Sequence, residues 1–373
     1  MEIIIGGDLV PTESNKDLFE NANLQELMGE KLLAIWQNAD VRIFNLETPL
    51  TDVESPIKKA GPNLIAATRT ANGINALKPS LVSVANNHIM DHGKNGLEST
   101  ENILNSFEIP YVGVGANLKE ASKSFIIEVE GKKIGVYACA EHEFSIATEK
   151  EPGANPFDPF ESLDHVRELK DNCDFVIVLY HGGKEHYRYP SPLLQKVCRK
   201  LVEKGADLVI CQHSHCIGCF EEYKEGTIVY GQGNFIFDDA DNEFWNSGLL
   251  VKVSLEEKTK IDYIPISKNG PIIRFADELT GKNLIEDFHK RSNEILIDGM
   301  VEKKYKFFAK EMISIYLATL AGYGKYRYRI HRYLFRGKLL KLKYFKKVKQ
   351  LQNFIECEAH QELLLESLKT INK

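Results

Sequence analysis

Short apolar runs alternate with longer segments of helical spacing over about the first 270 residues of the chain. The runs of β-forming residues are Glu2–Ile5, Val41–Phe44, Leu81–Ala85, Phe125–Val129, Lys133–Ala138, Phe175–Leu179, Leu208–Cys211 and Thr227–Tyr230. Helical spacing of apolar residues occurs over 17–38, 69–77, 94–107, 161–171 and 192–204. This alternation predicts an α/β domain in which helices cover central sheets.

The pattern changes near residue 275. Before it, the sequence predicts one hairpin at Glu130-Gly131 and another between Leu249–Leu255 and Lys260–Ile266. Beyond it, the strand pattern stops and long, charged, helical sequence follows. We therefore predict an α/β domain over residues 1–272 and a helical, partly basic extension over residues 273–373.

Polar residues directly follow six of the predicted strands. They are Asp8, Asn45 and Glu47, Asn87 and His88, His181, His213 and His215, and Gly233-Asn234. Taken singly, each has a commoner structural interpretation as a helix cap, a turn residue or a loop acid. Because α/β sheets build their sites at the carboxyl ends of strands, the recurrence at six strand ends favours a binding site. An extended backbone would point both imidazoles of His213 and His215 to one side.

The residue types at these strand ends indicate a metal. Carboxylate, amide oxygen and imidazole together suit Mn²⁺, Fe or Zn²⁺. Two ions about 3.5–4 Å apart can share a carboxylate and stabilise a phosphoryl displacement, with a histidine protonating the leaving group. In the stretch LVSVANNHIMDHG, Asn87 then offers its amide oxygen to a metal, His88 faces the substrate, and Asp91 holds the imidazole.

Five ordered motifs carry a resemblance to a known family. They are NLETPLT (45–51), VANNHIMDHG (84–93), YHGGKEHY (180–187), GADLVICQHSH (205–215) and VYGQGNFIFD (229–238). Together they resemble the motif series of the bacterial capsule-synthesis CapA family, which is itself similar to the calcineurin-like metallophosphoesterases. The resemblance covers roughly residues 1–255. It implies a four-layer αββα sandwich and a role in capsule or poly-γ-glutamate production.

The resemblance also implies roles for individual residues. The implied metal ligands are Asp8, Glu47 as a bridging carboxylate, Asn87, His181, His213 and His215. His88 would be the general acid, assisted by Asp91. Apart from the resemblance, the residues themselves suggest Asn45, Glu185 and Asn234 as substrate contacts, although Glu185 could equally orient His181 or form a surface salt bridge. One departure matters, because Asp8-Leu9-Val10 lacks the histidine that the phosphoesterase pattern has after its first aspartate. One metal position thereby loses a ligand, so the expectation is one or two divalent transition-metal ions.

These observations predict a metal-dependent hydrolase, in the first place a phosphoesterase, that acts in capsule or surface-polymer biosynthesis. The expected substrate is a phosphoester or an anionic polymer. Two alternatives stay open. The chain could be a polymer-binding or assembly component without catalytic activity, or it could cleave amide bonds of a γ-linked polyglutamate with the same metal centre.

Charge and cysteine usage bear on location. The seven cysteines lack framework spacing, and MEIIIGGDLV has no secretory n-region, so a cytoplasmic location is expected. Counted as Lys and Arg minus Asp and Glu, the net charge is −17 over residues 1–299 and +13 over residues 300–350. Residues 325–349 interleave basic with aromatic residues. We expect them either to pack as a helix on the acidic body or to contact an anionic membrane peripherally, at its inner face, and we expect no nucleic acid.

Overall fold

The computed structural model describes residues 1–238, 242–335 and 347–371, and over these residues two large sheets form the centre of the α/β part. The first has seven strands in the order β15 (Ile272–Phe275), β14 (Thr259–Asn269), β13 (Ser247–Leu255), β1 (Glu2–Leu9), β2 (Val41–Leu46), β3 (Leu81–Ser83) and β4 (Tyr111–Val112). The second has six in the order β11 (Phe220–Tyr223), β12 (Gly226–Val229), β10 (Leu208–Gln212), β9 (Phe175–His181), β7 (Lys132–Ala140) and β6 (Phe125–Val129). The short strands β5 (Val114–Gly115) and β8 (Gly153–Ala154) pair separately.

The two large sheets pack face to face, and the side chains of each strand alternate between the two faces of its sheet. In β1, Ile3 and Ile5 enter the core between the sheets, whereas Ile4 faces the outer helices. In β9, Ile177 enters the same central core, and Val178 faces outward on the other side. Because successive side chains of a strand point to opposite faces, each sheet has the central core on one face and an outer core on the other. The three cores therefore lie between four layers, which are helices, sheet, sheet and helices. The predicted αββα sandwich is therefore confirmed.

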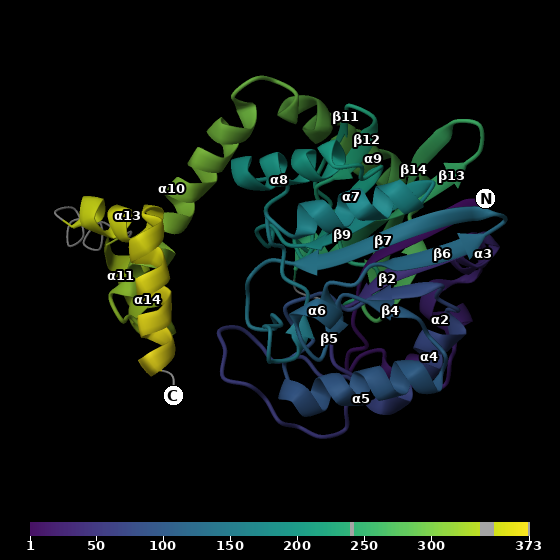
Figure 1. Ribbon diagram of the computed structural model, residues 1–373, viewed down its shortest axis with the longest axis horizontal. Coiled ribbons are helices and arrows are strands. Elements are labelled where there is room, and N and C mark those ends of the chain that lie inside the picture. The colour runs from purple at the N-terminus through teal and green to yellow at the C-terminus, as the bar shows by residue number, and fades with distance from the viewer. Residues whose placement is uncertain (239–241, 336–346, 372–373) are drawn as a thin grey trace. The chain divides into compact units, whose positions relative to one another are not determined.

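Helices cover both outer faces (Figure 1). Those on the first sheet are α1 (Lys16–Glu20), α2 (Leu24–Met28), α3 (Glu30–Asn38), the 3₁₀ turn η1 (Thr68–Thr70), α4 (Ala71–Ala76) and α5 (Gly93–Ser106). On the second sheet, α7 (Ser162–Asn172) and α8 (Pro192–Glu203) provide the cover, and the short α6 (Leu118–Ala121) packs beside β5 and β8. The single helix predicted over 17–38 is divided into three, because Asn23 caps α2 and Gly29 takes a left-handed φ of 72° before α3.

Parallel pairing brings the strand ends together. β1, β2 and β3 run parallel, as do β9 and β10, so their carboxyl ends lie at one edge of each sheet. The register of β1 against β2 shifts between Ile5 and Asp8. A Cβ on Gly7 would lie 2.1 Å from the carbonyl oxygen of Gly233, so only glycine permits this approach. The approach sets Asp8 close to the 232–236 segment, and Phe235 N donates to the Asp8 carbonyl.

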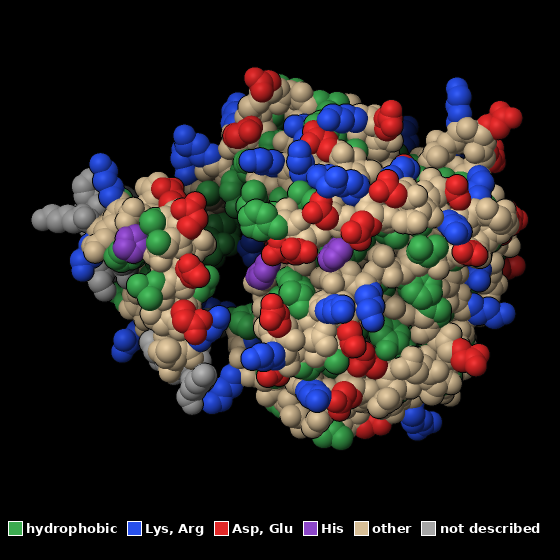
Figure 2. All heavy atoms as spheres, in the orientation of Figure 1, with side chains coloured by type: hydrophobic (Ala, Val, Ile, Leu, Met, Phe, Trp, Pro, Cys, Tyr) green, Lys and Arg blue, Asp and Glu red, His purple; other side chains and the backbone are tan. Residues whose placement is uncertain are grey.

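The chain divides into two compact units, Met1–Glu302 and Lys303–Lys373, later than the boundary expected at 272/273. Helix α9 (Glu278–Ile295) lies in the first unit because it packs on β11 and β14. In the described part of the chain, the α-helices that follow are α10 (Met300–Leu320), α11 (Lys325–Phe335), α13 (Val348–Glu356) and α14 (Glu358–Ile371). Hydrophobic side chains reach the surface of the second unit among charged ones, as Figure 2 shows.

Candidate metal centre

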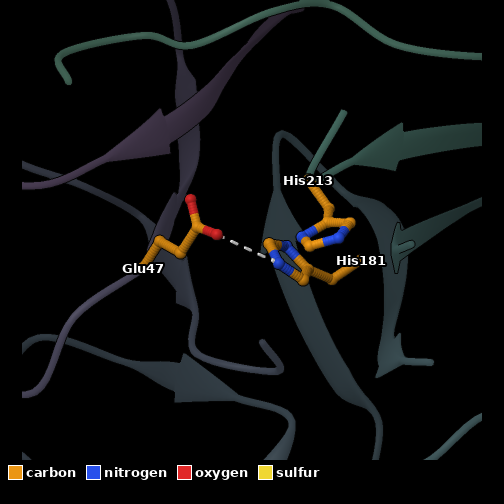
Figure 3. Close-up of side chains that lie close together, drawn as sticks. All are labelled: Glu47, His181 and His213. Carbon is orange, nitrogen blue, oxygen red and sulfur yellow. Dashed lines mark ion pairs between the residues drawn. The ribbon is translucent and has the colours of Figure 1, made fainter. Parts of the chain in front are cut away.

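Side chains from both sheets converge at the carboxyl ends of the parallel strands. Asp8 lies in β1, Glu47 directly follows β2, His181 ends β9, and His213 and His215 follow β10. Two groups have ligand atoms within 4.8 Å of one another, namely Glu47 with His181 and His213, and Asp8 with Glu47 and His215. Figure 3 shows the first group, in which the Glu47 carboxylate points toward the His181 ring. The structure thus brings together five of the six predicted ligands, all of them buried.

Glu47 is the carboxylate common to both groups. It is 0% exposed, and neither of its carboxylate oxygens makes a hydrogen bond within the described part of the chain. Its Oε1 lies 3.2 Å from Nε2 of His181 and 4.0 Å from Nε2 of His215. Burial raises the pKa of Glu47 to about 8, and the charge of Asp8 adds to the rise. A buried carboxylate without hydrogen-bond donors is costly, so this environment suits one that neutralises a cation.

Two of the three histidines, His181 and His213, are held in the neutral form that binds a metal. Burial lowers the pKa of His181 and, with neighbouring imidazoles, that of His213, so both rings are neutral near pH 7, the form that binds a metal. Nδ1 of His213 makes no hydrogen bond to the described residues, although the residue is only 6% exposed. Nδ1 of His215 lies 2.8 Å from Oδ1 of Asn234. This contact holds the ring so that Nε2 lies on the side of Glu47, whose Oε1 is 4.0 Å away.

The backbone at His213 and His215 differs from the sequence expectation. Their φ angles are 85° and 51°, in the left-handed region, rather than extended as predicted. A side chain with Cβ rarely adopts this conformation, and the strain is of the order of 1–3 kcal/mol at each residue. Both imidazoles nevertheless converge on the cluster. Strain of this kind persists where the surrounding structure imposes it, and it is concentrated at functional sites.

Asn45 and Asn234 lie behind the ligands. Both are buried, and each forms a hydrogen bond with a predicted ligand. Asn234 contacts His215, as described above, and Nδ2 of Asn45 donates to Oδ1 of Asp8 at 2.8 Å. Asn45 Nδ2 is also 3.3 Å from Nδ1 of His181. These positions indicate that the two amides orient ligands. Their contact with substrate stays a prediction.

Asn87, the sixth predicted ligand, presents its amide oxygen to the cluster. Its Oδ1 lies 2.9 Å from Nε2 of His181, while its Nδ2 donates to Oε2 of Glu143 at 2.9 Å. The carboxylate of Glu143 accepts only, so this bond fixes which end of the amide faces His181. Sequence reasoning missed Glu143, because it lies in a polar loop after β7 that carries no periodic or motif signal.

His88 and Asp91 form the expected pair beside the cluster. Nδ1 of His88 lies 2.6 Å from Oδ2 of Asp91, and the backbone N–H of Leu64 donates to the same oxygen at 2.6 Å. Lys59 forms a buried ion pair with Oδ1 of Asp91, and its Nζ lies 3.1 Å from Nδ1 of His88. The carboxylate therefore holds the imidazole with Nδ1 inward. Sequence reasoning missed Lys59, since a Lys-Lys pair in a polar loop is typical of a solvated surface.

Glu185 lies apart from the other predicted substrate contacts. It is exposed in the loop after β9, and its carboxylate forms a third group with His213 and His215 in which the ligand atoms lie within 4.8 Å. Its negative charge is among the causes that raise the pKa of Glu47. It thus faces the cluster from the solvent side.

Comparison with known proteins places this site in context. The family model described as "Bacterial capsule synthesis protein PGA_cap" matches residues 2–239. The capsule biosynthesis protein CapA of Bacillus anthracis is 30% identical over 241 residues, which cover 62% of this chain and 59% of that protein. The PGA biosynthesis protein CapA of Bacillus subtilis (strain 168) is 27% identical over 268 residues, covering 69% and 70%. The chain thus spans about three fifths of the first relative's length.

A solved structure titled a novel phosphatase from Mycoplasma pneumoniae aligns with a TM-score of 0.46 and 16% identity, over 73% of this chain and 95% of that one. A likeness of this size assigns no activity. The family match rests on sequence and spans more than half of the chain, including every predicted metal ligand and both members of the His88–Asp91 pair. This chain belongs to the bacterial capsule synthesis (PGA_cap) family.

Proposed function

We propose that the chain is a metal-dependent hydrolase that cleaves a phosphoester bond in the synthesis of capsule or another anionic surface polymer. The observation that carries this proposal is the environment of Glu47. Its buried carboxylate makes no hydrogen bond to the described residues, and Nε2 of His181 and Nε2 of His215 lie 3.2 Å and 4.0 Å from its Oε1. Family membership supports the polymer as the biological context.

The donor set fits a divalent transition metal. Around Nε2 of His181, Oδ1 of Asn87 lies at 2.9 Å and Oε1 of Glu47 at 3.2 Å. Neighbouring ligands bound to one ion at about 2.1 Å are separated by roughly 3.0–3.4 Å, so these atoms need little movement to share an ion. The residues that would hold a first ion are Glu47, Asn87, His181 and His213, and those near a second are Asp8, Glu47 and His215. Mn, Fe and Zn suit such mixed nitrogen and oxygen ligands.

A divalent ion held there supplies Lewis acidity toward a phosphoryl oxygen and toward water. The protein supplies the proton. With Nδ1 of His88 directed at Asp91, Nε2 is the nitrogen that faces a leaving oxygen, and the carboxylate keeps the ring in that orientation. Lys59 balances the buried charge of Asp91. The His88–Asp91 pair lies beside the ligand cluster, where it can donate a proton while the cluster holds the ion.

The experiment is a metal analysis joined to a substrate panel. Chelator-treated protein is reloaded with Mn²⁺, Fe²⁺ or Zn²⁺ and assayed on p-nitrophenyl phosphate, bis(p-nitrophenyl) phosphate and γ-linked glutamate oligomers. Metal-dependent release of nitrophenol that is lost in Glu47→Ala supports the proposal. Release of glutamate alone would indicate amide hydrolysis. Polymer binding without turnover of any substrate would indicate an assembly component.

For location, we propose a cytoplasmic protein with peripheral contact to anionic lipid through the basic stretch 325–349. Within the described residues, Tyr326 and Tyr333 are strongly exposed on α11, beside the exposed Arg327 and Arg329. Such a combination of aromatic and basic side chains suits an interface with anionic headgroups. Residues 336–346 of this stretch lie outside the described residues. No helix in the described part is long and apolar enough to span a membrane.

A further inference from the structure

We infer that Glu185 is a metal ligand, and that it makes the second of two metal positions richer in oxygen than the first. The inference rests on the proposed metal centre and adds a residue and a metal preference to it. Without Glu185, the second position has the side chains of Asp8, Glu47 and His215, one fewer than the first.

The geometry of three residues carries the inference. The ligand atoms of Glu185, His213 and His215 lie within 4.8 Å of one another. His215 also belongs to the group with Asp8 and Glu47, so it links Glu185 to the second position. The unpartnered Nδ1 of the buried His213, within the described residues, independently indicates that a ligand belongs here.

The loop that carries Glu185 is fixed at the next residue, His186, through its backbone and its side chain. The backbone N–H of His186 donates to the carbonyl of Ser214 at 2.9 Å, which ties this loop to the segment between the two histidines. Nε2 of His186 accepts a hydrogen bond from Nε1 of Trp245 at 3.0 Å, and the Trp245 ring lies 4.7 Å from the ring of His215. Glu185 is exposed, but its neighbour His186 is attached to the 213–215 segment and to Trp245.

The two positions differ in chemical character as a result. The first combines the shared Glu47 with one amide oxygen and two imidazoles, a borderline set that suits Zn²⁺ or Fe²⁺. The second combines three carboxylates, those of Asp8, Glu47 and Glu185, with a single imidazole. Carboxylates suit harder cations such as Mn²⁺. The second position would therefore take Mn²⁺ in preference to softer ions.

The test is a Mn²⁺ titration of the chelator-treated full chain, followed by electron paramagnetic resonance of free Mn²⁺ and by calorimetry. We expect the wild type to bind two ions with different affinities. Glu185→Gln should bind the weaker ion at least about tenfold less tightly and leave the tighter ion unchanged. Glu185→His should retain two ions but gain Zn²⁺ at the expense of Mn²⁺ in a competition between them. Glu225→Gln, in the exposed turn after β11, is the matched control and should behave as the wild type.

The outcomes separate this inference from the proposed function. A wild type that binds no metal would overturn both. A wild type that binds one ion only, or a Glu185→Gln variant that binds both ions with unchanged affinity, would overturn the role of Glu185 while leaving the proposed hydrolase intact. Because the readout is binding, a lack of turnover does not affect it.

Discussion

Nδ1 of His88 lies 2.6 Å from Oδ2 of Asp91, and this single contact fixes which nitrogen of the imidazole is left for the substrate. If the proposed acid role holds, His88→Ala should reduce turnover by roughly 10²–10⁴-fold. Metal content should stay near that of the wild type, since His88 belongs to none of the three ligand groups. Parallel measurement of kcat and of bound metal checks this, and loss of metal in His88→Ala would instead make His88 a ligand.

The ion pair of Lys59 with Asp91 should be essential for stability. Lys59 is 2% exposed and Asp91 0%, so removing one partner leaves a buried charge without compensation. We expect Lys59→Met to lower the free energy of unfolding by about 3–5 kcal/mol. Urea denaturation at fixed metal concentration measures it. The double variant Lys59→Met/Asp91→Asn should recover part of the loss, and no recovery would show that the methionine itself disturbs the packing.

Metal binding and stability should fall together when a ligand is removed. His181→Ala and His213→Ala are each expected to lower the metal content and the melting temperature, because a ligand that binds the native state stabilises it. His360→Ala, an exposed histidine of α14, is the control. Mass spectrometry of bound metal with thermal denaturation makes the comparison. Full occupancy in both variants would reject this ligand set.

Lys268 should make stability depend on pH. Its Nζ donates to the Phe237 carbonyl at 3.0 Å, and burial lowers its pKa from 10.5 to about 7. Between those pH values Lys268 binds more protons in the unfolded chain than in the folded one, so its contribution to the free energy of unfolding should rise with pH across this window. Lys268→Met should reduce that rise. Chelator-treated protein unfolded at pH 6.5, 8 and 9.5 tests it, with Lys260→Met on the exposed part of β14 as control.

Contact with anionic lipid should depend on α11. The full chain is expected to co-sediment with vesicles of phosphatidylglycerol and phosphatidylcholine, and high salt should release it. Arg327→Gln/Arg329→Gln removes two charges worth about 1 kcal/mol each, so binding should weaken roughly thirtyfold. Lys282→Gln/Lys290→Gln removes the same charge from α9. Equal weakening in both pairs would show a general charge effect and no docking by α11.

The hydrophobic pattern predicted the layers well because strand burial has a period of two. Ile3 and Ile4 already show it, one entering the central core and the other the outer core. The same pattern failed over 17–38, where a helical period continues across Asn23 and Gly29 although a cap and a left-handed φ end the helices there. Periodicity reports which face is buried, but it does not report where the backbone turns.

For the site, the strand-end ligands could be predicted because topology alone brings them together. Lys59 and Glu143 could not, because each acts through a partner far away in sequence, Asp91 in one case and Asn87 in the other. Asn45 shows that a residue's position in the site does not reveal its role. Its position at a strand end indicated the site, but only its hydrogen bond to Asp8 and its burial distinguish a residue that orients a ligand from one that contacts substrate.

The close approach of Gly7 to Gly233 makes position 7 intolerant of substitution, although glycine has no functional group. Any side chain at position 7 would force β1 away from the segment that leads to Asn234, and with it Asp8 away from His215. In a library of random variants selected for metal retention, position 7 should therefore be as depleted of substitutions as the ligands themselves. A residue without a functional group would then appear in such a screen as part of the metal centre.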